Sequence, residues 1–236
     1  MSPEPRLDPE RLRDALAGLR ERLDEAAARS GRAPGAVELV LAGKYVDTED
    51  VPALVAAGVE VVGENRLQDL RAKSDRAAGA VTFDFIGHLQ RRKVRDVLPL
   101  VRLLHSLDSA PLAAELVART AGPIRVLVEV NAGEEPTKHG ILPARVRGFV
   151  DEVSAHPDLV LGGLMVMPPL QSDPEGSRPY FAAARALAER LRAEWAGRHD
   201  FADLSMGTSQ DYTAAAEEGA TIVRVGRGVI DGSGGS

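Results

Sequence analysis

The chain has 236 residues, of which 44% are hydrophobic and 27% are charged, the balance of a globular protein with one large domain or two small ones. It contains no cysteine, which excludes disulfides, thiolate nucleophiles and cysteine-ligated zinc or iron–sulfur sites. The formal net charge of −6 argues against a nucleic-acid-binding surface, and neither a membrane-spanning apolar run nor a secretory signal is found, so we expect a cytoplasmic protein.

The sequence pattern predicts one amphipathic helix at the start, followed by eight short strands. Over residues 8–30, leucine and alanine recur at helical spacing. The eight predicted strands are apolar runs over residues 37–41, 59–62, 81–86, 101–104, 124–130, 160–166, 201–206 and 221–225. Helical patterns between them cover residues 50–57, 92–98, 111–118, 143–155, 178–195 and 211–218.

This alternation predicts parallel strands joined by right-handed crossovers. Eight such units in about 200 residues favour a closed (β/α)8 TIM barrel with an extra N-terminal helix. An open, doubly wound sheet is the alternative, which periodicity alone does not exclude. No linker stands out, so we predict one domain over residues 1–230 and a disordered tail over residues 231–236.

The first predicted strand leads to a lysine. Alternation along Val40–Leu41–Ala42–Gly43–Lys44 puts Lys44 on the same face as Val40 and Ala42, and it turns Tyr45 to the other side. Desolvating an ammonium is costly, and the neutral amine that desolvation favours can attack an aldehyde. The alternative is a lysine that reaches from the strand end into solvent.

The last predicted strand is interrupted by Arg224. A guanidinium inside an apolar strand must meet an anion or fixed acceptors, and an ion pair with a neighbouring barrel carboxylate is equally consistent with the pattern. Gly226 and Gly228 follow, and glycine lets backbone amides come close to a ligand.

Small hydroxyl residues stand at the end of the seventh predicted strand and just after it. Ser205, Thr208 and Ser209 stand with Gly207 just before a predicted helix, where they can cap the helix or bind an anion. TIM barrels often bind phosphate between the loops after strands seven and eight. Because both loops are rich in glycine, serine and threonine, the sequence predicts a phosphate site there.

Three further strand ends carry polar residues. Asn65, after the second strand, can form a hydrogen bond to a ligand ring oxygen. For His88, after the third strand, no second histidine or carboxylate recurs at ligand spacing, so no metal site is predicted. Lys138 and His139, in the loop after the fifth strand, are expected at the surface.

Taken in order, these strand ends resemble the pyridoxal 5′-phosphate (PLP) homeostasis protein family. The resemblance covers almost the whole chain, and it depends on seven motifs in the family's order rather than on any one of them. The motifs are residues 40–44 (VLAGK), 63–65 (GEN), 85–90 (FIGHLQ), 138–140 (KHG), 163–165 (GLM), 205–211 (SMGTSQD) and 223–226 (VRVG).

The resemblance implies a barrel similar to the N-terminal domain of alanine racemase, that is, PLP fold type III. It implies that Lys44 holds PLP as a Schiff base, that Ser209 and nearby backbone amides hold the phosphate, and that Arg224 faces the pyridine nitrogen. Lys138 matches a second lysine implicated as a secondary PLP contact. The predicted cofactor-binding residues are Lys44, Asn65, Ser205, Thr208, Ser209, Arg224, Gly226 and Arg227.

Several positions depart from the family pattern. Tyr45 stands where threonine is common, and Arg92 stands where asparagine is usual. Thr208 replaces a common methionine. Arg227 replaces a small hydroxyl residue that often binds the phosphate, which leaves the backbone amide and the guanidinium as the donors at this position.

An arginine opposite the pyridine nitrogen favours its unprotonated form and makes the cofactor a weak electron sink. Racemisation also needs two proton-transfer groups, and we expect no C-terminal β domain of the kind that supplies one in racemases. The resemblance therefore implies a monomeric, non-catalytic carrier that buffers or delivers PLP, in transient contact with PLP-dependent apo-enzymes. An amino-acid racemase and a phosphate-binding barrel without PLP are the alternatives.

Overall fold

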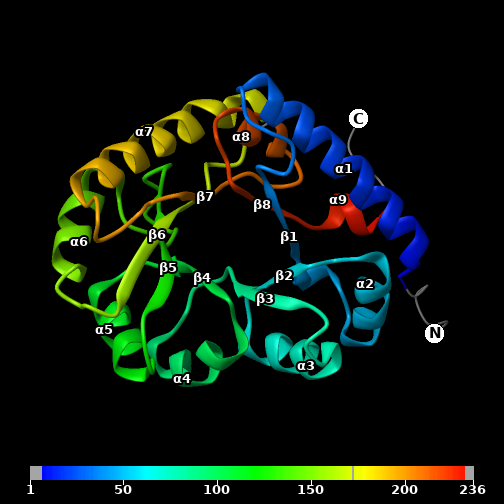
Figure 1. Cartoon of the computed structure of the whole chain (residues 1–236), viewed down its shortest axis with the longest axis horizontal. Helices are drawn as coiled ribbons and strands as arrows, with labels where there is room; N and C mark the ends of the chain where they lie inside the picture. Colours follow the sequence, from blue (N-terminus) through cyan, green and yellow to red (C-terminus); the bar gives the residue numbers. More distant parts are fainter. Residues whose placement is uncertain (1–6, 172, 232–236) are drawn as a thin grey trace.

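Eight parallel strands close into a barrel in chain order, each paired with the next and β8 with β1 (Figure 1). The structure is a computed structural model that describes residues 7–171 and 173–231. The closed barrel is confirmed and the open sheet is excluded. The strands are β1 (Glu38–Ala42), β2 (Val61–Glu64), β3 (Thr82–Phe85), β4 (Leu103–Leu107), β5 (Ile124–Val130), β6 (Leu159–Val166), β7 (Asp203–Ser205) and β8 (Ile222–Val225).

Helices surround the barrel and connect successive strands (Figure 1). Each helical segment expected from the sequence is found, some with 3-10 turns at their ends, whereas α3 and α9 were not expected. The helices are α1 (Pro9–Arg29), α2 (Val51–Ala57), α3 (Leu67–Ala77), α4 (Val94–Val97), α5 (Ala110–Arg119), α6 (Val146–Val153), α7 (Arg178–Glu194), α8 (Tyr212–Glu217) and α9 (Arg227–Ile230). The 3-10 turns are η1 (Gly43–Tyr45), η2 (Thr48–Asp50), η3 (Arg91–Lys93), η4 (Leu98–Leu100), η5 (Pro143–Arg145) and η6 (Pro174–Ser177).

Helix α1 is the extra N-terminal helix. The side chain of Asp8 accepts a hydrogen bond from the amide of Glu10, and Pro9 occupies the first turn, where a missing N–H costs nothing. Buried leucines on one face, including Leu12 and Leu19, pack α1 against α8 and α2. The helix thereby covers the seam where β8 pairs with β1.

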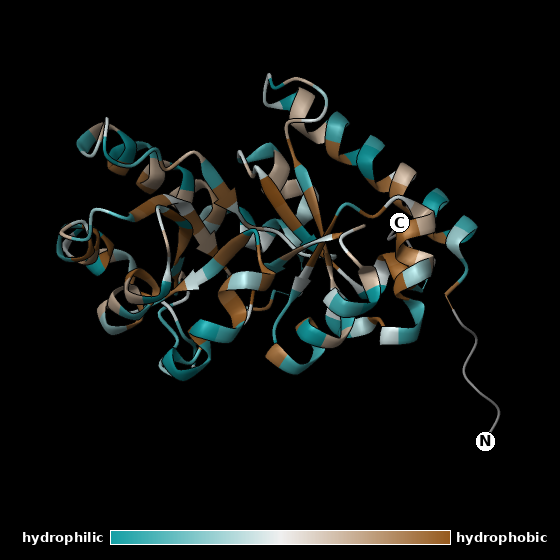
Figure 2. Ribbon diagram, turned by 60° about the horizontal axis from the view of Figure 1, so that its bottom comes forward, coloured by the Kyte–Doolittle hydropathy of each residue, from teal (hydrophilic) through white to brown (hydrophobic). Residues whose placement is uncertain are grey.

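The apolar residues form two layers. The larger layer lies between the strands and the surrounding helices, and a smaller one fills the barrel with Val40, Val61, Leu103, Leu127, Met165 and Ile222. In Figure 2 the strands are largely brown, whereas the helices mix teal and brown, as expected for strands buried on both faces. The barrel is therefore a packed core, and its open space lies at one end.

Two sequence expectations concern the ends and surface of the chain. Residues 232–236 of the expected tail lie outside the described residues, while Asp231 is described and follows α9. Within residues 7–171 and 173–231, no helix combines the length and the apolar character that crossing a bilayer requires.

Candidate cofactor site

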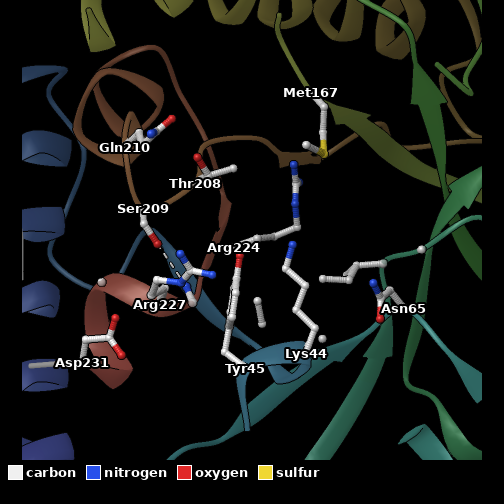
Figure 3. A pocket seen from close by; sticks show the side chains of 16 residues that line it. Lys44, Tyr45, Asn65, Met167, Thr208, Ser209, Gln210, Arg224, Arg227 and Asp231 are labelled. Carbon is white, nitrogen blue, oxygen red and sulfur yellow. Dashed lines mark hydrogen bonds between the residues drawn. The ribbon is translucent and has the colours of Figure 1, made fainter. Parts of the chain in front are cut away.

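A cavity of about 650 Å³ opens at the carboxyl ends of the strands, where (β/α)8 barrels carry their functional groups. Seven of the eight residues predicted to bind the cofactor line it. Figure 3 shows the amine of Lys44 pointing toward Arg224, with Ser209 and Arg227 on the other side of Tyr45. The lining residues are Ala42, Lys44, Tyr45, Gly63, Asn65, Ile86, Gly87, Met167, Thr208, Ser209, Gln210, Arg224, Gly226, Arg227, Gly228 and Asp231.

Lys44 enters this cavity from a turn and not from a strand. Strand β1 ends at Ala42, and Gly43–Tyr45 forms the 3-10 turn η1. The turn brings the ring of Tyr45 to 4.9 Å from Lys44 Nζ, so the expectation that alternation turns Tyr45 away is wrong. Lys44 is also exposed to the open cavity, so the desolvated amine expected from the strand pattern is not found.

A buried ion pair holds the backbone beneath Lys44. Lys73 Nζ donates hydrogen bonds of 2.6 Å both to the carbonyl of Gly43 and to Glu64 Oε1. A side chain at Gly43 would collide with Glu64, whose oxygen lies 2.1 Å from the position of an added Cβ. The amide of Asn65 donates to the other carboxylate oxygen of Glu64. The pair therefore ties the ends of β1 and β2 together, and with them Lys44 and Asn65.

Arg224 is buried in β8 and held by uncharged acceptors. Its Nη1 donates to the carbonyl and to the hydroxyl of Ser205, and its Nη2 donates to the carbonyl of Val166. These are fixed acceptors, and no carboxylate of the described residues forms an ion pair with it. Burial lowers the pKa of Arg224 to about 10, which still leaves it charged at neutral pH. Two of its five N–H donors remain for a ligand in the cavity.

Behind Arg224, a line of hydrogen bonds crosses the barrel interior. Ser205 Oγ lies 2.9 Å from His105 Nδ1, and His105 Nε2 lies 3.1 Å from Asp84 Oδ2. Arg102 donates to both oxygens of Asp84 and also pairs with Glu38. Ser205 is fully buried and does not line the cavity, so it contacts Arg224 and not a bound ligand.

The protonation of this line follows from its burial. Burial would raise the pKa of Asp84, but the hydrogen bonds from His105 and Arg102 outweigh it and hold the pKa below its usual value. Burial also lowers the pKa of His105, so its ring is neutral. Nε2–H then donates to Asp84, Nδ1 accepts from the Ser205 hydroxyl, and that hydroxyl accepts from Arg224. Every donor and acceptor from Asp84 through His105 to Ser205 is thus assigned, and this arrangement fixes the guanidinium of Arg224.

The loops after β7 and β8 meet at the opposite side of the cavity. Ser209 Oγ accepts a hydrogen bond of 3.1 Å from the amide of Gly226, at the start of α9 (Figure 3). The Thr208 amide and hydroxyl both lie within hydrogen-bond distance of Asp211 Oδ1, which shapes the loop. These contacts leave the Ser209 hydroxyl proton and the amides of Arg227 and Gly228, at the start of α9, as donors without an acceptor among the described residues. The phosphate site at this place stays a prediction.

Tyr45 lies between two cationic side chains. Its ring centroid is 4.9 Å from Lys44 Nζ and 5.2 Å from the Cζ of Arg227, both within the range of cation–π attraction. An added Cβ at Gly226 would lie 2.5 Å from the Tyr45 ring, so the ring occupies the space that this glycine leaves. Residue type alone gave no signal for this role, because Tyr45 only reaches the cavity through the η1 turn.

Two other predicted positions differ in placement. Asn65 lines the cavity, and its buried Oδ1 has no hydrogen-bond partner among the described residues. Lys138 does not line the cavity and forms an ion pair of 2.6 Å with Glu135. Met167, Gln210 and Asp231 line the cavity without having been predicted, because nothing in their residue types distinguishes them from ordinary loop residues.

Comparison with known proteins decides the family. Residues 16–231 match the family described as "Alanine racemase, N-terminal domain". A pyridoxal phosphate homeostasis protein of Aquifex aeolicus is 37% identical over 217 residues, which cover 90% of this chain and 94% of that protein. The chain belongs to the pyridoxal phosphate homeostasis protein family. The human protein of that name is 31% identical, over 90% of this chain and 83% of its own length.

Two solved structures are similar to this chain to different degrees. PipY of Synechococcus elongatus, determined with PLP bound, superposes with a TM-score of 0.80 at 29% identity, covering 93% of this chain and 99% of PipY. Alanine racemase of Corynebacterium glutamicum has a TM-score of 0.66 at 15% identity, covering 93% of this chain and 60% of the racemase, and it shares the fold.

Proposed function

We propose that this protein binds PLP as a Schiff base on Lys44 and takes part in PLP homeostasis, buffering the cofactor or delivering it. The observation that carries the proposal is the cavity itself, where the Lys44 amine, the fixed Arg224 guanidinium and the Ser209 hydroxyl face a common space. The membership of the family and the PLP bound to PipY support the same cofactor.

The residues fit the parts of PLP one by one. Lys44 supplies an amine for the aldehyde, and Arg224 supplies the N–H donors left over from its bonds to Ser205 and Val166. Ser209 and the amides that begin α9 supply donors for the phosphate, with Arg227 adding charge. When bound, PLP offers an aldehyde that condenses with amines and a ring that withdraws electrons.

Arg224 supports a carrier and not a catalyst. A guanidinium with a pKa of about 10 keeps its protons at neutral pH, so Arg224 would act only as a donor toward the ring nitrogen and would favour its unprotonated form. An unprotonated ring is the weaker electron sink, and strong turnover of amino acids needs the stronger one. The role we propose for Arg224 is to hold the cofactor in this unreactive form.

A protein that delivers PLP must be in the same compartment as the enzymes that receive it. We propose a cytoplasmic monomer in transient contact with PLP-dependent apo-enzymes; the absence of cysteine from the sequence is compatible with a reducing compartment. Light scattering coupled to gel filtration should give the mass of one chain, with and without PLP. A mass of two chains would contradict the monomer.

Delivery is tested by mixing the PLP-loaded protein with an apo-enzyme that depends on PLP and following the recovery of enzyme activity. We expect recovery faster than the release of free PLP, measured with an excess of a phosphatase that consumes released PLP, because contact makes the transfer direct. Recovery no faster than free release would leave buffering as the function and overturn direct delivery.

An amino-acid racemase is the second candidate, and one observation favours it. The Tyr45 hydroxyl belongs to a ring 4.9 Å from Lys44 Nζ, so the cavity holds two groups able to move a proton. Incubating the PLP-loaded protein with L- and D-alanine in deuterated water separates the two functions. The carrier predicts slow or absent Cα exchange, and rapid exchange of both enantiomers that is lost in Tyr45→Phe would establish the enzyme.

A further inference from the structure

Three residues outside the proposed cofactor contacts gather at the rim of the barrel mouth. His88 follows β3, Asp108 follows β4, and His139 lies in the loop after β5. One ligating atom from each lies within 4.8 Å of the others. A search for ligand spacing along one segment misses this group, because its members come from three successive strand ends.

One carboxylate oxygen of Asp108 lies near a nitrogen of each histidine. Asp108 Oδ2 lies 3.0 Å from Nδ1 of His88 and 3.9 Å from Nδ1 of His139. The two imidazole rings are stacked, with centroids 3.8 Å apart and an interplanar angle of 10°. Aromatic pairs usually keep their centroids about 4.5–7 Å apart, offset or edge to face. Nearly parallel rings aim their in-plane lone pairs in parallel, so the two rings must rotate apart before both nitrogens can face one ion next to Asp108.

We propose that His88, Asp108 and His139 bind a divalent transition-metal cation, with Zn²⁺ as the best match. Zn²⁺ takes neutral imidazole nitrogens and carboxylate oxygens, and three protein ligands plus a water complete its tetrahedral shell. Imidazole also suits Co²⁺ and Ni²⁺, whereas Ca²⁺ and Mg²⁺ prefer oxygen ligands alone. The two nitrogens and one oxygen of this group therefore select a transition metal.

Exposure and charge fit a site that fills from solvent. The side chains of His88 and His139 are 39% and 58% exposed, so the rings can turn their nitrogens toward an arriving ion. The Asp108 side chain is 10% exposed, which fixes the anchoring carboxylate. The nearest cation along the loop, Lys138, is paired with Glu135 at 2.6 Å, so its charge is offset.

The test uses the full-length, untagged protein stripped of metal with a chelator. Calorimetric titration with Zn²⁺ should show one equivalent bound, and Co²⁺ should give the visible absorption of a tetrahedral site. His88→Ala, His139→Ala and Asp108→Asn should each weaken Zn²⁺ binding by about tenfold or more, since each removes a ligand. His156→Ala, a half-buried histidine in the turn before β6, is the matched control and should bind as the parent does.

The outcomes separate the metal site from misfolding and from the proposed function. Circular dichroism and the absorbance of bound PLP should be unchanged in the three variants, because none of these side chains lines the cofactor cavity. Loss of Zn²⁺ with retained PLP establishes the site. Equal Zn²⁺ binding by the parent and the His88→Ala/His139→Ala double variant, or no saturable binding by the parent, overturns it.

Discussion

At the residue scale, the hydroxyl of Ser205 decides how Arg224 is held. It accepts from Arg224 and lies next to His105, so it connects the guanidinium to a buried line that ends at Asp84 and Arg102. A buried donor or acceptor that loses its partner costs about 1–3 kcal/mol. The position of Arg224, and with it the contact that we propose to the PLP ring nitrogen, therefore depends on a side chain that does not line the cavity.

The first prediction follows from this link. Ser205→Ala should weaken PLP binding by about tenfold, since His105 Nδ1 loses its donor and Arg224 keeps only carbonyl acceptors. Fluorescence or absorbance titration with PLP measures the change. Ser106→Ala is the matched control, because the buried hydroxyl of Ser106 has no partner among the described residues. Equal affinities for the two variants would contradict the role of Ser205.

Lys73 acts on Lys44 through the backbone. Because Glu64 is fully buried and its pKa is raised by burial, its charge depends on the ammonium 2.6 Å away. Breaking a buried ion pair by removing one partner costs about 3–5 kcal/mol, whereas replacing both partners with apolar groups costs less.

The second prediction uses that difference. Lys73→Met should lower the free energy of unfolding by about 3–5 kcal/mol, and Glu64→Leu/Lys73→Met should regain part of the loss. Urea unfolding measures both. If the double variant is the less stable of the two, the ion pair is not the source of the effect.

The chemistry of single residues was partly predictable. Lys44 and Arg224 stand out in the sequence because a charged residue at the end of an apolar strand needs a reason. Tyr45 and Lys73 give no such signal. Tyr45 enters the cavity only because β1 stops at Ala42 and the chain continues as the 3-10 turn η1, without further strand alternation. Lys73 is buried only because Glu64 and the Gly43 carbonyl accept its hydrogen bonds there.

At the scale of elements, the eight strands were predictable and one major helix was not. The strands are buried on both faces and read as short apolar runs. Helix α3 places Lys73 on its buried face between Leu70 and Ala77, so its apolar period is interrupted by a charge. Lys73, the charged residue that interrupts the apolar period of α3, is also the residue that holds the backbone at Gly43, next to Lys44.

A buried histidine joins elements at the other end of the barrel. His199, 3% exposed, accepts from the amide of Leu161 through Nδ1, and its Nε2 lies 2.8 Å from the hydroxyl of Ser154. Burial, and then the charge of Arg198, lower the pKa of His199 to about 4. Protonation would remove the acceptor for Leu161, so this ring stabilises the junction of α6 and β6 only when neutral.

The third prediction is a loss of stability in acid. A histidine with a pKa near 6.5 when unfolded and about 4 when folded takes up its proton first in the unfolded chain. Its contribution is therefore complete above about pH 6.5 and falls as the pH drops toward 4. Urea unfolding at several pH values should show a shallower decline for His199→Gln than for the parent. Parallel declines would contradict the assignment.

At the scale of the whole molecule, the barrel gathers separate strand ends at one mouth. The proposed cofactor contacts come from the ends of β1, β2, β7 and β8, and the proposed metal ligands come from those of β3, β4 and β5. The order of the motifs predicted the first group, because the resemblance to a family carried their roles. His88 and His139 also lie in motifs of that resemblance, residues 85–90 and 138–140, but no motif gives them a ligand role or contains Asp108, and only the closed barrel brings the three together.

The central claim is that Lys44 forms the Schiff base with PLP. The most direct test is to load the full-length protein with PLP, reduce it with borohydride and locate the phosphopyridoxyl group by peptide mass spectrometry. We predict one modified residue, Lys44, and loss of the adduct in Lys44→Ala but not in Lys138→Ala. Modification of another lysine, or of none, would contradict the account.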